Sequence, residues 1–138
     1  MEKIFSAFDV SAAGLRAQRI RMNIIANNIA NATTTRTPDG GPFRRQLVVL
    51  MGKEAEKADR KGFGVDVVKI VHDMSPFKTV FNPGHPDADG QGYVEYPNVE
   101  IPMEMIDMIG ASRGYEANVA AVNATKRMTN TALEILRD

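Results

Sequence analysis

The 138-residue sequence contains no cysteine, which excludes disulfides, thiol chemistry and the usual cysteine-based zinc and iron–sulfur sites. It also has no net charge, because 17 acidic and 17 basic side chains balance. No strong electrostatic field therefore favours nucleic acid or an anionic membrane surface. Long hydrophobic runs are missing as well, since no segment reaches the roughly 18 unbroken apolar residues of a transmembrane helix.

The first residues do not have the pattern of a cleavable secretory signal. Glu2, Asp9 and Arg16 interrupt any apolar core, and no basic segment precedes it. We expect any export of this chain from the cytoplasm to use a route that needs no such signal.

Both ends of the chain carry a seven-residue apolar repeat that the middle lacks. Steps of four and three residues place every member of such a repeat on one stripe of a helix. We call each stripe a seam. The seams consist of Ile4, Phe8, Ser11, Leu15, Gln18, Met22, Ile25 and Ile29 near the N-terminus, and of Met108, Ala111, Tyr115, Asn118, Val122, Thr125, Thr129, Ala132 and Leu136 near the C-terminus.

The seams predict two long helices, one over residues 3–29 and one from about Pro102 to Leu136 or Arg137. The first is expected to end in an Asn- and Thr-rich run, whose side chains compete for backbone hydrogen bonds. A proline is tolerated in the first turn of the second.

Isolated helices are marginal in water, and polar seam residues such as Ser11, Gln18 and Asn118 cost stability while they fix register and partner. We therefore predict that both helices are poorly ordered in the free monomer and become ordered when several helices share a seam. The alternative is an ordinary antiparallel helix hairpin within one globular chain.

The middle of the chain has a different character. Short runs, the clearest of them rich in β-branched residues, predict strands at 46–50, 64–72, 77–81 and 93–96. The charged stretch Lys53–Lys61 predicts an exposed loop, and Asn82–Pro86 cannot hold regular structure. Short strands in a segment of about 60 residues make a small, marginal β unit.

The predicted fold class is therefore α+β. Long N- and C-terminal helices form a coiled-coil-like bundle, and a small β-rich insert separates them in the sequence. Residues 1–35 and 97–138 make up the helical core, and residues 36–96 the insert domain. Such helices suit packing against other helices more than enclosing a catalytic pocket, which points to an assembly subunit.

Candidate catalytic and metal-binding groups are sparse. His85, Asp87 and Asp89 offer a possible metal site, but the segment meets only part of the calcium-loop pattern and no predicted helices flank it. Tight turns in which side chains cap the backbone are favoured instead. The sequence has no recognisable catalytic triad, nucleophile elbow or phosphate loop. We predict no enzymatic activity, no cofactor and no bound metal.

Three stretches of the sequence resemble bacterial flagellar rod and hook proteins. They are SAAGLRAQ with ANNIAN within residues 11–31, PGHPDAD with GYV and PNV within residues 83–99, and EMIDMI with ASR and YEAN within residues 104–118. The resemblance covers nearly the whole chain except residues 37–62. The length is similar to that of the short proximal-rod subunits of the basal body.

The resemblance implies export of the unfolded chain through the flagellar type III apparatus, without a cleaved signal. It also implies helical polymerisation into the rod, the drive shaft of the basal body that crosses the periplasm. Terminal helices of many subunits would surround the export channel, with the insert outward. The implied partners are copies of this chain, other proximal rod subunits, the base-linking rod protein and the distal rod. Neither nucleic acid nor direct membrane insertion is expected.

The seams and the resemblance together suggest the contacts between subunits. The segment Asn27–Asn31 and the loop Gly84–Val94 are implied packing elements. Tyr115 is the favoured anchor, because an aromatic ring with a polar tip suits a partly hydrated interface. The predicted interface residues are Phe8, Leu15, Met22, Ile25, Asn28, Ile29, Asn31, Met108, Tyr115, Asn118, Val122 and Leu136.

The sequence leaves two other functions open. One is a non-flagellar coiled-coil adaptor or scaffold whose ends pair in a stable dimer. The other is a small metal-dependent hydrolase that uses His85, Asp87 and Asp89.

Overall fold

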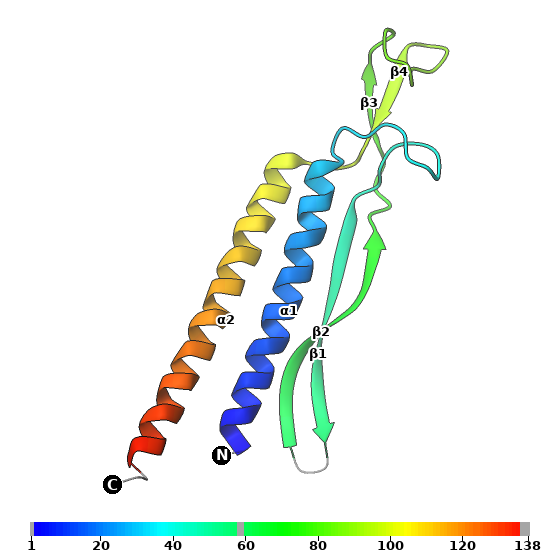
Figure 1. Cartoon of the computed structure of the whole chain (residues 1–138). Coiled ribbons are helices and arrows are strands. Elements are labelled where there is room, and N and C mark those ends of the chain that lie inside the picture. The colour runs from blue at the N-terminus through cyan, green and yellow to red at the C-terminus, as the bar shows by residue number, and fades with distance from the viewer. Residues whose placement is uncertain (1, 58–59, 136–138) are drawn as a thin grey trace.

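The two seams form the two long helices of the molecule. A computed structural model describes residues 2–57 and 60–135. Helix α1 spans Glu2–Ala30 and helix α2 spans Ile101–Ile135, which gives lengths of about 44 and 52 Å. They lie side by side and run in opposite directions (Figure 1). Both predicted helices are confirmed to within one residue at their described ends, whereas Leu136 and Arg137 lie outside the described residues.

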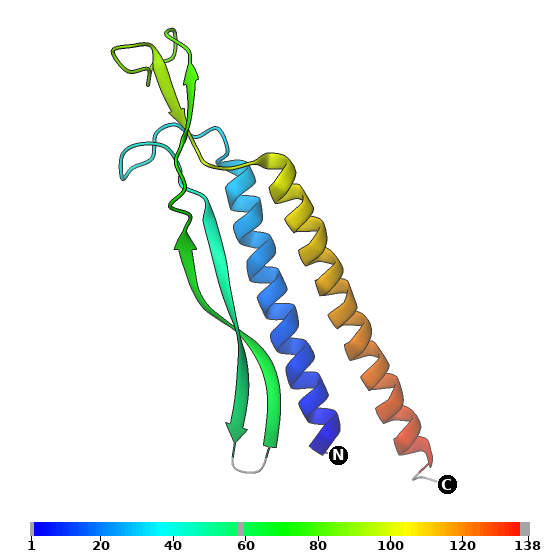
Figure 2. The same ribbon diagram turned by 180° about the vertical axis from the view of Figure 1, so that it is seen from behind.

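A long β-hairpin follows α1. Strands β1 (Gln46–Lys57) and β2 (Arg60–His72) pair antiparallel from Gln46 opposite His72 to Lys57 opposite Arg60. A register shift between Val49 and Leu50 bends the pair. Figures 1 and 2 show the twisted hairpin running alongside α1.

The prediction of a loop at Lys53–Lys61 is wrong for the residues that the structure describes there. Residues 53–57 continue β1 and residues 60–61 begin β2, while residues 58–59 lie outside the described part of the chain. Hydrogen bonds between backbone groups join the two strands, so a run of charged side chains does not prevent the strands from pairing.

A second, shorter hairpin extends beyond the ends of the helices (Figures 1 and 2). Strands β3 (Lys78–Phe81) and β4 (Tyr93–Tyr96) pair antiparallel, close to the predicted ranges. Gly92, which precedes β4, has a φ of 83°, and a Cβ there would lie 3.0 Å from the Phe81 ring. A side chain at this position would therefore meet both backbone strain and a clash.

Helix α1 is the middle layer of the longer part of the molecule. It packs against α2 on one side and against β1 and β2 on the other, and along the described residues α2 does not pack on either long strand (Figures 1 and 2). This arrangement confirms the predicted α+β class with two long terminal helices.

The apolar core is thin. The buried apolar residues in the described part of the chain are Ala17, Ile25, Val94, Pro97, Val99 and Ala111. Across residues 2–57 and 60–135, neither helix has a stretch apolar and long enough to span a membrane. Polar contacts therefore take a large part in holding the elements of this chain together.

Candidate functional site

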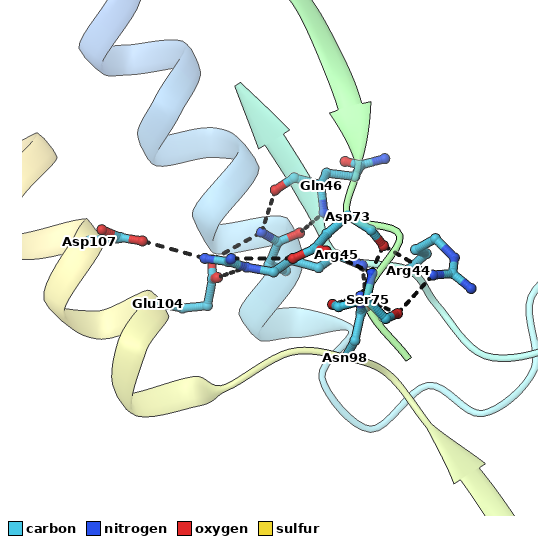
Figure 3. A network of polar contacts seen from close by, with 9 residues as sticks. Arg44, Arg45, Gln46, Asp73, Ser75, Asn98, Glu104 and Asp107 are labelled. Atoms are coloured by element: carbon cyan, nitrogen blue, oxygen red, sulfur yellow. Dashed lines mark hydrogen bonds and ion pairs between the residues drawn. The ribbon is translucent and has the colours of Figure 1, made fainter. Parts of the chain in front are cut away.

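The most deeply buried polar cluster lies where the two helices and the long hairpin meet, beside the segments that lead into and out of the short hairpin. Its centre is Glu104, in the first turn of α2, with 1% of its surface exposed. Glu104 Oε1 accepts a 2.6 Å hydrogen bond from Arg45 Nε, and Oε2 accepts a 3.0 Å bond from Asn28 Nδ2. We call this cluster the polar junction (Figure 3).

Arg45 connects Glu104 with two further carboxylates. Its guanidinium lies 3.6 Å from Asp73 Oδ2 and 3.5 Å from Asp107 Oδ2. Asp107 also lies 3.5 Å from Arg21 Nη2 on α1. A buried carboxylate needs such charged partners, because removal of one of them leaves an uncompensated charge in a dry site.

Asn28 joins α1 to β1 through a two-way amide pairing. Its Nδ2 donates to the Gln46 carbonyl at 2.9 Å, and its Oδ1 accepts from the Gln46 N–H at 2.9 Å. Because the same Nδ2 also reaches Glu104, one side chain connects the end of α1, the start of β1 and the start of α2.

Asn98 closes the junction from the segment before α2. Its Oδ1 accepts from the Arg45 N–H at 2.9 Å, and its Nδ2 donates to the carbonyls of Asp73 and Ser75. Arg44 donates to the same two carbonyls and lies over the Phe77 ring, 4.1 Å from its centroid.

Asp73 is a residue of the polar junction whose carboxyl group has a lowered pKa. Hydrogen bonds from the backbone N–H and the side chain of Ser75 lower the pKa of Asp73 below its ordinary value of 3.8, and the positive charge of Arg45 lowers it further. This carboxylate is therefore charged at neutral pH and balances part of the charge of Arg45.

Sequence reasoning missed the junction apart from Asn28. One signal for Glu104 was present, because it precedes Met108 by four residues and so continues the seam that faces α1. An acid on a buried stripe predicts a charged partner. The sequence contains no comparable signal that the partner is Arg45.

The predicted interface residues occupy different environments. Ile25 and Asn28 are buried inside the chain, and Asn31 caps the end of α1 by bonding Asn27 and Thr34. Leu136 lies outside the described residues. The other predicted interface residues are half-buried, and these are Phe8, Leu15, Met22, Ile29, Met108, Tyr115, Asn118 and Val122.

Large apolar side chains are exposed on α2 and on the long hairpin. On α2 they include Met105, Ile106 and Ile109, and on the long hairpin Met51 and Val68. Apolar surface gathered in this way commonly marks a contact with another molecule.

The metal-site candidates form turns. The Asp87 N–H donates to His85 Nδ1, and Asp89 Oδ1 accepts from the N–H groups of Gln91 and Tyr93. Asp87 is held by Thr35 and Arg36. The prediction of capped turns is confirmed, and the residues that the structure describes contain no cluster of three His, Cys, Asp or Glu side chains suited to a metal.

Two family models match the ends of the chain. The model described as flagella basal body rod protein matches residues 8–36, and the model described as flagellar basal body rod FlgEFG protein C-terminal matches residues 91–135. These segments contain most of α1 and all of α2.

Full-length relatives carry one consistent description. A protein of Borreliella burgdorferi named flagellar basal-body rod protein FlgC is 44% identical over 97% of this chain and 98% of its own length. Proteins with the same name from Bacillus subtilis and Aquifex aeolicus are each 42% identical, over 95% and 97% of this chain and 97% and 98% of their own lengths. These matches favour the rod subunit over the adaptor and the hydrolase. The chain belongs to the FlgC family of flagellar basal-body rod proteins and is a structural subunit of the rod.

Proposed function

We propose that this chain is exported unfolded through the flagellar type III apparatus without a cleaved signal, and that it then polymerises through its terminal helices into the proximal rod. Its neighbours are copies of itself, other proximal rod subunits, the base-linking rod protein and the distal rod. The rod crosses the periplasm, and the chain contributes shape and stiffness there and no catalysis.

The observation that carries this proposal is the surface that the chain leaves uncovered. Its accessible surface is 9957 Å², whereas a compact monomer of 15.1 kDa is expected to expose about 7,100 Å². A typical specific contact buries about 800 Å² on each partner. The excess, about 2,900 Å², corresponds to contacts with roughly three or more neighbours.

The fold supports a corresponding division of roles within this proposal. Residues 1–35 and 97–138 are the proposed helical core, which packs among the helices of other subunits, and residues 36–96 are the proposed insert, which faces outward. The half-buried seam residues, Leu15, Met22 and Val122 among them, then pack against neighbouring helices with the part of their surface that the helix hairpin leaves open.

A complementation experiment tests the proposal. Leu15→Asp or Val122→Asp places a charge in a seam, so a strain that lacks this chain should express either variant at a normal level and fail to swim. Asp39→Asn is the control, since Asp39 is exposed in a turn and lies outside both helices. Swimming cells that carry either seam variant would refute the proposed contacts.

A second readout separates assembly from export. The seam variants should be present in cell extracts and absent from purified basal bodies, whereas the Asp39→Asn protein should be found in both. A seam variant that enters basal bodies as efficiently as the control would place the polymerisation surface elsewhere.

A further inference from the structure

We propose that Asp87 is a latch that holds the short hairpin in one orientation relative to the rest of the chain before neighbouring subunits bind. We call residues 79–96, which comprise nearly all of β3, the loop after it and β4, the arm. This inference rests on the proposed polymerisation, because a fixed arm matters only if neighbours meet it.

The arm shares little packing with the rest of the molecule. Along residues 2–57 and 60–135, strands β3 and β4 pack on each other and on none of the other helices and strands. They extend beyond the ends of the helices (Figures 1 and 2). Val94 is the one buried residue of the arm. A single buried side chain offers little apolar contact to fix the angle of the whole arm.

Prolines interrupt the backbone pairing between the long hairpin and the arm. Pro76 lies between the end of β2 and the start of β3, and Pro97 directly follows β4. Proline has no N–H group to donate to a strand ladder. The two hairpins accordingly form separate two-stranded sheets, so a continuous ladder does not set the orientation of the arm.

Polar contacts anchor the arm at its base. Asn98 Nδ2 donates to Ser75 Oγ at 2.9 Å and to the Ser75 carbonyl at 3.2 Å (Figure 3). Lys78 Nζ donates to the Val99 carbonyl at 2.9 Å. All of these groups belong to the two segments that lead into and out of the arm. They fix the point of attachment, and the arm can rotate about it unless a second contact holds it.

Asp87 supplies that second contact from the loop between β3 and β4. Its Oδ2 accepts a 2.8 Å hydrogen bond from Thr35 Oγ1, and its Oδ1 lies 3.2 Å from Arg36 Nε. Thr35 and Arg36 belong to the segment that connects α1 to β1. Within the described residues, no other hydrogen bond or ion pair joins the arm to the rest of the chain.

A cleft beside the latch leaves room for movement. It has a volume of about 490 Å³, and its lining includes Gly41 and Pro42 from the connecting segment and Tyr93 and Glu95 from the arm. Without the Asp87 contacts the arm could therefore change its angle to this segment. A surface that is already positioned loses less conformational freedom when it binds, so the latch should favour incorporation into the rod.

Distances between spin labels test the latch in the purified chain, which has no cysteine of its own. Gln91→Cys places a label on the arm and Lys69→Cys places one on β2, both at exposed positions. The labelled chain is mixed with an excess of unlabelled wild type, at a concentration where the helices are formed. Double electron–electron resonance then gives the distribution of distances between the two labels.

We expect one narrow distribution with Asp87 present and a wider one in Asp87→Ala. Glu95→Ala is the matched control, because it removes an exposed acid from the same arm, and its distribution should stay narrow. A second label pair, Arg19→Cys with Lys69→Cys, reports on α1 and the long hairpin. Its distances should be the same in Asp87→Ala as in the wild type.

A competition experiment tests the effect on assembly. Wild type and variant carry different epitope tags and are expressed together in a strain that lacks this chain. The ratio of the tags in purified basal bodies is divided by their ratio in cell extracts. Asp87→Ala should be depleted from basal bodies, whereas Glu95→Ala should enter like the wild type. Asp87→Asn keeps an acceptor for the Thr35 hydroxyl and should fall between them.

The outcomes separate this inference from the function on which it rests. Equal distributions for Asp87→Ala and Glu95→Ala would overturn the latch, as would a change in the Arg19–Lys69 distances, which would indicate general unfolding. A wider distribution with normal incorporation of Asp87→Ala would overturn its role in assembly. These results leave the proposed polymerisation intact, whereas absence of even the wild-type chain from basal bodies would refute the polymerisation itself.

Discussion

The side-chain amide of Asn118 lies directly against Gly14 on the facing helix, so that a Cβ on Gly14 would stand 2.6 Å from Asn118 Oδ1. The relationship is reciprocal one turn away, where a Cβ on Gly114 would lie 3.1 Å from the Gln18 amide. Asn118 Nδ2 also donates to the Gly114 carbonyl at 2.7 Å. Each helix thus places a glycine opposite an amide of the other, and this fixes the antiparallel register of α1 and α2.

Gly14→Ala should weaken the helix pair. At a solvent-exposed helix position, replacing Gly by Ala stabilises the helix by up to about 1 kcal/mol. At Gly14 the new methyl group would displace the side chain of Asn118, and such overpacking costs about 1–3 kcal/mol of folding stability. Thermal unfolding followed by far-UV circular dichroism, at a protein concentration where the helices are formed, should show a lower midpoint.

Gly110→Ala is the control for that change, because nothing lies within 4 Å of a Cβ at Gly110. Its midpoint should be equal to that of the wild type or higher. The double variant Gly14→Ala with Asn118→Ala shortens the side chain that the new methyl group meets. It should recover part of the fall in the unfolding midpoint that Gly14→Ala causes. Equal midpoints for Gly14→Ala and Gly110→Ala would contradict the close approach of the helices.

Arg45→Met should destabilise the polar junction strongly. Glu104 would lose its charged partner while it stays buried, which costs about 3–5 kcal/mol in comparable cases. Glu104→Gln should also be harmful, because its new N–H₂ group, on one side or the other, would face a donor of Asn28 or Arg45. Denaturant unfolding measures both effects.

The ion pair of Lys78 with Glu100 provides the comparison for the junction. Its side chains are 44% and 62% exposed, and exposed pairs contribute about 0–1 kcal/mol. Glu100→Gln should therefore leave the denaturant midpoint almost unchanged. A loss as large as that of Arg45→Met would show that burial is not what makes the junction important.

Acid should weaken the junction through Asp73. Because the pKa of Asp73 is lower in the folded chain than in the unfolded one, its contribution to stability is present above its ordinary pKa of 3.8 and is lost as pH falls through the lower folded value. Asp73→Asn keeps an acceptor for the Ser75 N–H and removes the titration. The variant should lose less stability than the wild type between pH 6 and pH 3, and equal losses would assign the acid sensitivity to other groups.

Local patterns in the sequence predicted the regular elements well. The seams located α1 and α2, and the β-branched runs located the strands, because each signal depends on residues close together in the chain. The charged stretch Lys53–Lys61 misled the prediction, since side-chain charge says little about a ladder held by backbone hydrogen bonds. The extent of β1 depends on its pairing with β2 and cannot be read from β1 alone.

The polar junction could not be predicted for a different reason. Asn28 and Glu104 are 76 positions apart, and Arg45 and Glu104 are 59 apart. No periodicity relates residues at such separations, and only the folded chain brings them together. The Gly14–Asn118 contact has the same character, because Gly14 alone suggests a weak point in a helix and not a close approach.

Order in the terminal helices should depend on association. The buried apolar side chains that α1 and α2 contribute are Ala17, Ile25 and Ala111 in the described part of the chain, and two of the three are small. Such a contact offsets little of the entropy cost of ordering helices of 29 and 35 residues. Circular dichroism of the purified chain should therefore show helicity that falls on dilution, together with a decrease in sedimentation coefficient. Full helicity in a dilute monomer would mean that the two helices fold without other subunits. Contacts with neighbouring subunits would then not be needed for the helices to become ordered.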